Sequence, residues 1–508
     1  MSNKLKNYWV PFAVLFGLSF AFSLTTHFSP VSNETFGHDA GIFAYIGMAL
    51  TKGEVLYTGA WDNKGPLLYF LNALGILINY RYGIYLIELC SLFATSVFLY
   101  KTALLFVSRF RALICAAFCM LPLFQTLEGG NLSEEYALPF TTLAFYLIAK
   151  FFKNDFVLKK YEMLIVGMCI AAVLILRLNI LAFLGVAVLG VIIALVAKKE
   201  YKILTTVTVF ALLGFFLFLA PFVIYLAKTG SLKMCIDTVY LGALGFFSDI
   251  SLFSRIANVL NMVVDTKSSG ALYMVILFVL FFPIGFVKNR ANRSSLDVLG
   301  IISLFGLLIT LIANSLSGAH HMHYFMCFIP VLIIPAVWSI EKIEMLCDKD
   351  FWAKAGLKGV SLLVFAVFCV NYYLPAITAL YTLSHEKSYN YVADEKYISE
   401  NSEPTDLVQI IGGTVGVTAN YRTNRLSASN YFYYANGRFS DESKVIFADE
   451  ISNDVIEAKP KLIMFETQEK MDDFLAHLTD RQKWDDLIES EYTVQENDFY
   501  HMVYKRNA

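Results

Sequence analysis

Long apolar runs separated by short polar segments occupy most of the chain up to about residue 383. A bilayer core of about 30 Å is spanned by a helix of about 20 apolar residues. We therefore predict a polytopic α-helical membrane protein with about eleven transmembrane helices. The predicted spans are residues 8–28, 83–107, 112–126, 135–152, 162–179, 180–197, 203–227, 270–287, 296–316, 322–340 and 358–382.

A shorter apolar stretch, Pro66 to Tyr80, follows a polar loop and is short for a span. We expect it to form an interfacial or re-entrant helix. The loop that contains it, residues 29–82, is predicted to be external to the membrane. The transmembrane domain as a whole is predicted to cover residues 1–383.

The pattern changes after about Ser384, where short apolar runs alternate with polar segments. This alternation predicts a soluble α/β domain at residues 384–508. The expected strands are Leu407–Ile411, Lys444–Phe447 and Lys461–Phe465, and a helix is expected at Gln468–Leu478. Gly412–Gly413–Thr414 follows the first strand but lacks the spacing of a nucleotide fingerprint, so a plain turn is expected.

Composition supports a membrane protein: 57% of residues are hydrophobic and 16% are charged. Soluble domains have about 25% charged residues, and a water-soluble chain with this composition would expose its apolar excess. The net charge of -2 argues against a nucleic-acid partner, which needs clustered basic surface. Lys and Arg collect in alternate loops, which are therefore expected on the cytoplasmic side. With an odd number of spans, the C-terminal domain is expected outside.

The first external loop concentrates polar residues that could perform chemistry. Asp39 follows the first span, where a carboxylate can act as a general base toward a hydroxyl. Lys64 precedes the short apolar helix, where an ammonium at headgroup depth can hold a lipid phosphate. From composition alone, a solvated loop without function is an equally good interpretation.

The residues of this loop follow a spaced pattern: Asp39, Tyr45, Gly53 with Tyr57, and Asp62 to Leu67. The pattern resembles the first periplasmic loop of the GT-C glycosyltransferases, especially the family related to protein O-mannosyltransferases and the lipid A aminoarabinose transferase. Two positions depart from it. Ala40 stands where the family usually has a second acid directly after the first. The usual Lys-Pro-Pro-Leu reads Lys64-Gly65-Pro66-Leu67 in this chain. The missing acid weakens the case for a paired-carboxylate metal site.

The resemblance also extends to the second external loop and to the end of the fifth span. It implies that Glu134 or Glu135, at the start of a span, binds sugar hydroxyls or orients the acceptor. A helix cap formed by Ser133 with acids in the first turn is the alternative. Arg177 is implied to bind the donor phosphate, and snorkelling to the interface is its alternative.

Three histidines lie close together before the tenth predicted span. His320 and His323 have the spacing of zinc ligands on a helix, but no Cys or nearby acid completes such a site. The resemblance implies instead that His323, Tyr324 and His320 line the sugar or phosphate pocket, as do Asp62 and Tyr45 of the first loop. No cofactor is expected to be required, and a divalent metal is the minor alternative.

The resemblance thus implies an inverting glycosyltransferase that moves a hexosyl or pentosyl group from a polyprenyl-phosphate donor to an acceptor hydroxyl outside the membrane. Asp39 would be the catalytic residue. The acceptor could be a lipid, a protein or a cell-wall polymer, and the expected location is a bacterial plasma membrane. Two alternatives remain: a flippase or exporter of lipid-linked saccharides, and a membrane sensor with an external ligand-binding domain.

Overall fold

The computed structural model describes residues 2–32, 38–157, 159–242, 251–288, 293–316, 320–347, 377, 381, 389–434, 441–497 and 502–507. Contacts divide the chain into two compact units. Unit 1 consists of Met1–Ser29, Tyr85–Ile224 and Tyr240–Tyr381; unit 2 consists of Pro30–Ile84, Tyr225–Val239 and Thr382–Ala508. The external loop therefore makes its contacts in the same unit as the C-terminal domain.

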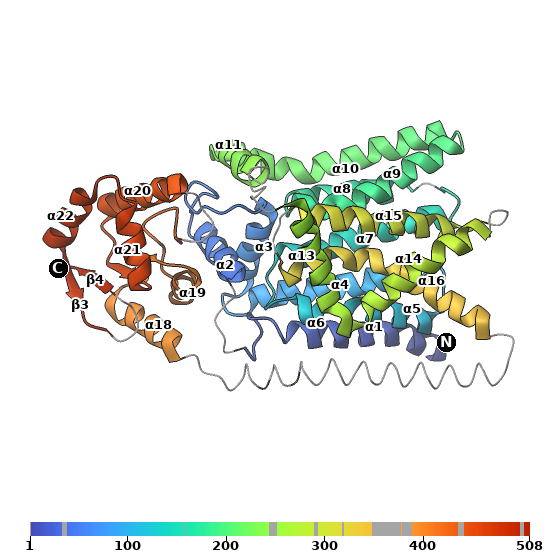
Figure 1. Ribbon diagram of the computed structural model, residues 1–508, viewed down its shortest axis with the longest axis horizontal. Coiled ribbons are helices and arrows are strands. Elements are labelled where there is room, and N and C mark those ends of the chain that lie inside the picture. Colours follow the sequence, from blue (N-terminus) through green and yellow to red (C-terminus); the bar gives the residue numbers. More distant parts are fainter. Residues whose placement is uncertain are drawn as a thin grey trace. The chain divides into compact units, whose positions relative to one another are not determined.

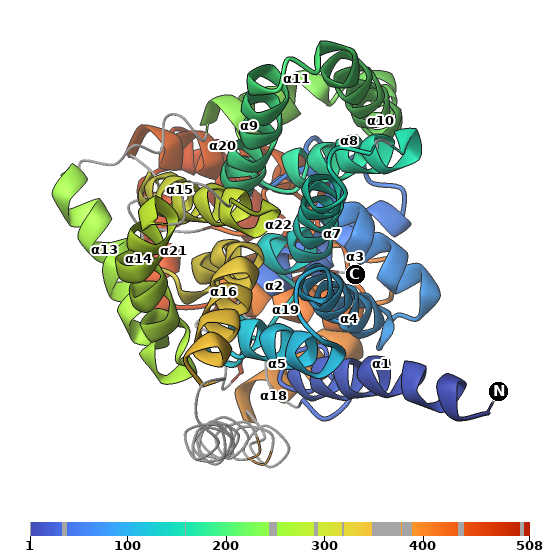
Figure 2. The same cartoon turned by 90° about the vertical axis from the view of Figure 1, so that its right-hand side faces the viewer.

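Unit 1 is a helical bundle (Figures 1 and 2). Its main elements are α1 (Ser2–Ser23), α4 (Gly83–Leu104), α5 (Arg109–Met120), α6 (Leu123–Thr126), α7 (Ser133–Lys153), α8 (Lys160–Leu174), η1 (Leu178–Ile180), α9 (Leu181–Ala197), α10 (Tyr201–Lys228), α13 (Leu252–Asp265), η3 (Thr266–Ser269), α14 (Ala271–Lys288), α15 (Ser295–Ser315), η4 (Met322–Phe328) and α16 (Ile329–Cys347). Helix α16 packs against α5, α14 and α15 and is enclosed by them (Figure 2). Its apolar residues therefore form the centre of this bundle.

The apolar outer surface of unit 1 fits a lipid environment. Within the described residues, six helices are long and apolar enough to cross a membrane. Helix α10 exposes Leu213, Phe216 and Leu217 by 52%, 60% and 57%, which lipid tolerates and water does not. All predicted spans that lie on described residues are helical, and the last, 358–382, falls almost entirely outside them. The number of spans stays a prediction.

Unit 2 combines the segment Pro30–Ile84 with a mixed sheet and its helices. Its elements are α2 (His38–Thr51), α3 (Pro66–Ile78), α11 (Leu232–Cys235), η2 (Ile236–Leu241), α18 (Tyr389–Asn401), β1 (Val408–Ile411), α19 (Thr414–Thr423), α20 (Asp441–Ala458), β2 (Leu462–Phe465), α21 (Gln468–Ala476), α22 (Arg481–Glu491), β3 (Tyr492–Gln495) and β4 (Met502–Arg506). The stretch Pro66 to Tyr80 is thus helical as expected, up to Ile78.

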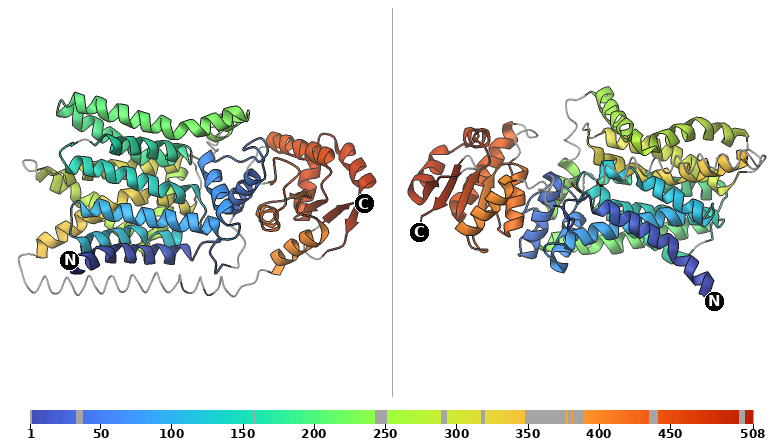
Figure 3. Two further views of the ribbon diagram at one scale, coloured as in Figure 1. Left: turned by 180° about the vertical axis from the view of Figure 1, so that it is seen from behind. Right: turned by 90° about the horizontal axis from the view of Figure 1, so that it is seen from below.

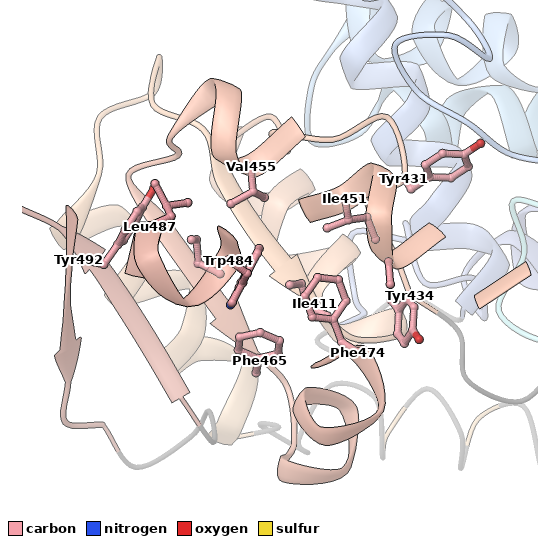
Figure 4. Close-up of a cluster of buried hydrophobic side chains, with 12 residues drawn as sticks. Ile411, Tyr431, Tyr434, Ile451, Val455, Phe465, Phe474, Trp484, Leu487 and Tyr492 are labelled. Atoms are coloured by element: carbon pink, nitrogen blue, oxygen red, sulfur yellow. The ribbon is translucent and has the colours of Figure 1, made fainter. Parts of the chain in front are cut away.

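The sheet has the order β1-β2-β4-β3, with β1 and β2 parallel and the other pairs antiparallel. Successive residues of a strand point to opposite faces, and both faces are covered (Figure 3). On one face Ile411 and Phe465 pack against α20, α21 and α22, with Trp484 among the buried side chains (Figure 4). On the other face Ile410 and Met464 belong to a second core with residues of α18 and α19. The expected α/β domain is confirmed as a three-layer arrangement.

One predicted strand of this domain is wrong, and two strands escaped prediction. Lys444–Phe447 lies within α20, because a short apolar run fits a buried helix face as well as a strand. Strand β3 has two exposed positions, and strand β4 has a single buried residue and ends in Lys and Arg, so neither shows a run of buried apolar residues. The turn at Gly413 donates its N–H to Glu466 Oε2 at 2.6 Å. A protein carboxylate thus occupies the place where a phosphate loop would hold an anion.

Burial of Asp394 on α18 makes the stability of unit 2 depend on pH. Its side chain is 3% exposed, and Oδ1 has no hydrogen-bond partner among the described residues. Burial, with smaller contributions from the Glu395 and Glu466 carboxylates, raises the pKa of Asp394 to about 7. Unfolded Asp has a pKa of about 4, so the folded state holds an extra proton between these values. Stability is then lost as the pH rises from about 4 to about 7.

We expect Asp394→Asn to stabilise unit 2 by about 1–2 kcal/mol at pH 8, after allowance for solvent screening, and to leave stability at pH 4 unchanged. Thermal unfolding of the full chain in detergent, followed by fluorescence of the buried Trp484, measures the effect. Asp472→Asn, at an exposed position on α21, is the control. An equal gain at both pH values would refute the titration of Asp394.

Candidate active site

Helices α2 and α3 pack against each other and carry the two ends of the external-loop motif. Asp39 lies in the first turn of α2 and is partly exposed. Phe43 follows one helical turn later and so lies on the same face. Its ring contacts the edge of Tyr69 on α3, with centroids 6.1 Å apart. This aromatic contact holds the Asp39 face of α2 against α3.

Lys64 lies immediately before α3, which begins at Pro66 after the N-cap residue Gly65. The backbone at Lys64 is held on both sides: Tyr57 donates its hydroxyl to the Lys64 carbonyl at 2.8 Å, and the Lys64 N–H donates to the Tyr69 hydroxyl at 3.1 Å. The Lys64 ammonium lies 5.9 Å from the centroid of the Phe43 ring. The Lys64 ammonium therefore lies near the ring of Phe43, one helical turn after Asp39 on α2.

Among the described residues, no carboxylate forms an ion pair with the Lys64 ammonium, so its positive charge can act on a ligand. Its Nζ donates to the neutral amide of Asn63 at 2.8 Å. The neighbouring carboxylate, Asp62, is 3% exposed and accepts hydrogen bonds from Tyr69 at 2.6 Å and Tyr433 at 3.3 Å. Asp62 therefore positions the loop through two tyrosines, an indirect role that the sequence does not reveal.

Tyr45 joins α2 to the C-terminal domain. It is 3% exposed, and its hydroxyl accepts a hydrogen bond from the Ser427 N–H at 2.8 Å. Its ring lies 4.2 Å from that of Phe432. The loop is held at a second place by Tyr80, whose ring stacks on Tyr421 at 5.2 Å. Burial raises the pKa of Tyr45 above its ordinary value. These contacts make the motif loop an integral part of unit 2.

In unit 1, Glu134 and Arg177 form an ion pair at the start of α7. Their side chains are 1% and 18% exposed. Arg177 also donates to the Tyr324 hydroxyl at 2.9 Å and lies 4.6 Å from the centroid of that ring. Three predicted site residues thus form one cluster, and the pair carries no net charge. Arg177 is anchored inside unit 1, so simple snorkelling does not account for it.

His323 and His320 contact two different acidic residues. His323 Nδ1 contacts Glu128 Oε2, and the Met322 N–H donates to Glu128 Oε1 at 3.2 Å. Burial alone would raise the pKa of Glu128, but the contacts with His323 and the backbone N–H groups lower it below its usual value. His320 instead contacts Asp265 Oδ2 at 3.1 Å. Of the two, only His323 adjoins Tyr324, with ring centroids 4.7 Å apart.

Glu135 lies in a different environment from Glu134. It is completely buried, and neither carboxyl oxygen makes a hydrogen bond with the described residues. The buried Glu88 accepts from Thr26 Oγ1 at 3.0 Å and from the Asn131 N–H at 2.7 Å. The alternative of a Ser133 cap is not what the structure has, because Leu132 is the N-cap and the Ser133 hydroxyl donates to Glu134 Oε2 at 2.8 Å. Within the described part of the chain, no three His, Cys, Asp or Glu residues are placed to hold a metal ion.

A protein-family model covers both clusters. It is described as "Putative competence-induced protein Ccs4 N-terminal domain" and matches residues 3–394. The chain belongs to this family. The matched region contains the α2–α3 motif and the Arg177 cluster, and it ends within α18. A sequence search of curated proteins finds no match to this chain.

Solved structures share the fold of this Ccs4-family chain. ArnT from Cupriavidus metallidurans bound to undecaprenyl phosphate has a TM-score of 0.62 at 13% identity, with 99% of this chain and 98% of that chain covered. ArnT in its apo state gives 0.61 at 13% identity, with the same shares covered. AglB, an oligosaccharyltransferase from Archaeoglobus fulgidus in complex with an inhibitory peptide and a dolichol-phosphate, gives 0.56 at 13% identity, covering 99% and 74%. The predicted GT-C fold is thereby confirmed.

The pairing of Arg177 with Glu134 leads to a double-mutant prediction for the Ccs4-family fold. Arg177→Ala leaves a buried carboxylate unpaired, which costs about 3–5 kcal/mol. Glu134→Gln with Arg177→Met removes both charges and should recover most of that stability. Thermal unfolding in detergent measures the cycle, with Lys150→Ala, which breaks the more exposed pair with Glu162, as the control. If the double variant were as unstable as Arg177→Ala, the ion pair would not be the cause.

Proposed function

We propose that this Ccs4-family protein is an inverting glycosyltransferase that uses a polyprenyl-phosphate sugar as donor and an acceptor hydroxyl on the outer side of the membrane. The observation that carries the proposal is the packing of α2, which bears Asp39 in its first turn, against α3, which begins directly after Lys64 and Gly65, on a GT-C fold. A carboxylate and an ammonium carried by these two packed segments supply the base and the phosphate-binding group that this transfer needs.

In this reaction the acceptor oxygen attacks the anomeric carbon of the sugar. The bond from that carbon to the phosphate oxygen breaks, and the electron pair leaves with the lipid phosphate. Asp39 accepts the proton of the attacking hydroxyl, and attack from the side opposite the phosphate inverts the anomeric centre. Lys64 stabilises the charge that develops on the leaving phosphate. The N-terminus of α3 directly after Lys64 favours an anion as well.

The solved structures support the donor class, since one holds undecaprenyl phosphate and another holds dolichol-phosphate. The structure of unit 1 modifies the expected role of Arg177. The charge of Arg177 is compensated by Glu134, so we assign the stabilisation of the phosphate charge mainly to Lys64. The Arg177–Glu134 pair with Tyr324 and His323 is better suited to hydrogen bonds with sugar hydroxyls. The identity of the sugar and of the acceptor is left to experiment.

The test uses the full chain in lipid nanodiscs with a radiolabelled undecaprenyl-phosphate hexose and a bacterial envelope extract as acceptor. A transferase releases undecaprenyl phosphate and places the label on the extract. In sealed vesicles, a flippase would move the labelled lipid between leaflets without cleaving it. Movement without cleavage across a panel of hexose and pentose donors would contradict the proposal.

A further inference from the structure

A polar pocket lies within unit 2, between the loop after α2 and the C-terminal domain. Its volume is about 430 Å³, which is in the range of small-molecule sites. Three carboxylates line it: Glu54 from the loop and Glu450 and Asp454 from α20. No Lys or Arg is among the described residues of its wall. The pocket therefore disfavours phosphate and favours a positively charged group.

The carboxylates are held toward each other at an electrostatic cost. Glu450 and Asp454 are four residues apart on α20, where like charges repel. Asp454 is fixed by the Ser429 hydroxyl, which donates to Oδ2 at 2.6 Å. Burial raises the pKa of Glu54, Glu450 and Asp454 alike. A bound cation would offset both the repulsion and the burial.

Glu54 is placed in the pocket by the shape of its own loop. A Cβ added at Gly59 would lie 2.5 Å from Glu54 Oε2, so the carboxylate rests where only a glycine leaves room. The loop also folds back through the Gly59 N–H, which donates to the Val55 carbonyl at 2.7 Å. Glu54 therefore reaches the pocket wall from a part of the chain separate from α20, which carries the other two carboxylates.

A buried amide behind the wall adds an independent observation. Gln409 on β1 is completely buried, and its Oε1 accepts from Ser427 Oγ at 2.7 Å and from the Ser429 N–H at 3.1 Å. Both serines line the pocket. The Nε2 of Gln409 has no hydrogen-bond partner among the described residues, although buried donors are normally paired. This unpaired donor therefore lies directly behind the two serines of the wall.

We propose that this pocket binds a primary ammonium group that carries neighbouring hydroxyls, as in an amino sugar. The carboxylates bind the ammonium, and the Ser and Asn groups of the wall bind the hydroxyls. The volume is far larger than a single metal ion needs, which favours an organic cation. We further assign the amino sugar to the acceptor, and this assignment rests on the proposed function. The binding itself does not rest on it.

The test measures binding of glucosamine to the full chain in nanodiscs by saturation-transfer NMR, with N-acetylglucosamine and glucose as neutral comparisons. We expect glucosamine alone to bind, and Asp454→Asn or Glu450→Gln to weaken it at least about tenfold, the scale of one lost charge-assisted contact. Asp472→Asn, exposed on α21 and outside the pocket wall, should leave binding unchanged. Equal binding of all three sugars, no binding, or insensitivity to both variants would overturn the proposal.

Two further arms define the ligand and separate the two proposals. Lysine amide that binds as tightly as glucosamine, or Ca²⁺ that displaces it stoichiometrically, would contradict the assignment to an amino sugar. The Asp39→Asn chain must bind glucosamine normally even when it transfers no sugar. If transfer occurs but glucosamine does not bind, the pocket proposal fails alone; if glucosamine binds but no donor is cleaved, the proposed function fails alone.

Discussion

Replacing Asp39 with Asn should lower the rate of sugar transfer by about 10³-fold, the typical contribution of a positioned general base. Asn has nearly the same shape but accepts no proton at neutral pH. Asp39 lies in the first turn of α2 and is partly exposed, so the change should leave the packing of α2 against α3 intact. The measurement is the initial rate of undecaprenyl phosphate release in nanodiscs.

The matched control for this prediction is Asp472→Asn, which removes an exposed helical carboxylate from the same unit. Both variants should keep the unfolding temperature of the parent chain. A transfer rate within about twofold of the parent would remove Asp39 from the reaction, since a general base accounts for at least about 10²-fold.

Lys64→Ala should lower transfer by about 10²–10³-fold, the range for losing one preorganised charge in a transition state. The backbone at Lys64 is held by Tyr57 and Tyr69, and these bonds do not involve its side chain. The loop should therefore keep its conformation in the variant. Lys64→Arg should retain part of the activity, because a guanidinium still supplies the point charge but with a different geometry.

Kinetics against donor concentration distinguish the roles of Lys64. Stabilisation of the leaving phosphate lowers kcat, whereas a contact made equally with the bound donor raises only KM. Lys52→Ala, at an exposed Lys of the same loop that donates to the Asn424 carbonyl at 2.7 Å, is the control. An active Lys64→Ala enzyme with parental kinetics would show that the likeness of Asp62 to Leu67 to the family motif has no functional basis.

The contacts of the motif loop bear on the role of the C-terminal domain. We expect this domain to be non-catalytic and to assist acceptor docking. In unit 2, Trp61 of the loop packs against Tyr431 and Phe447, with centroids 5.3 and 5.5 Å apart. The domain therefore supports the backbone that carries Lys64. A role in positioning thus joins the proposed role in acceptor binding.

The sequence by itself determined the features that depend on local pattern. Apolar length predicted the helices of unit 1, and Pro66 predicted where α3 begins, because proline fixes the backbone and lacks an N–H at a position that needs none. Motif spacing selected Asp39 and Lys64, which lie on α2 and directly before α3, two helices that pack against each other. Strands β1 and β2 were also predictable, since each is fully buried and apolar at every position except Gln409.

Only the tertiary structure decided which polar groups are paired. Glu134 and Glu135 are adjacent in sequence, yet Glu134 pairs with Arg177, whereas Glu135 is buried and its carboxyl oxygens have no hydrogen-bond partner among the described residues. Neighbouring helical residues point in different directions. Glu54 and Asp454 line the same pocket although they are 400 positions apart in the sequence. Periodicity carries no information about such partners, which depend on how distant elements pack.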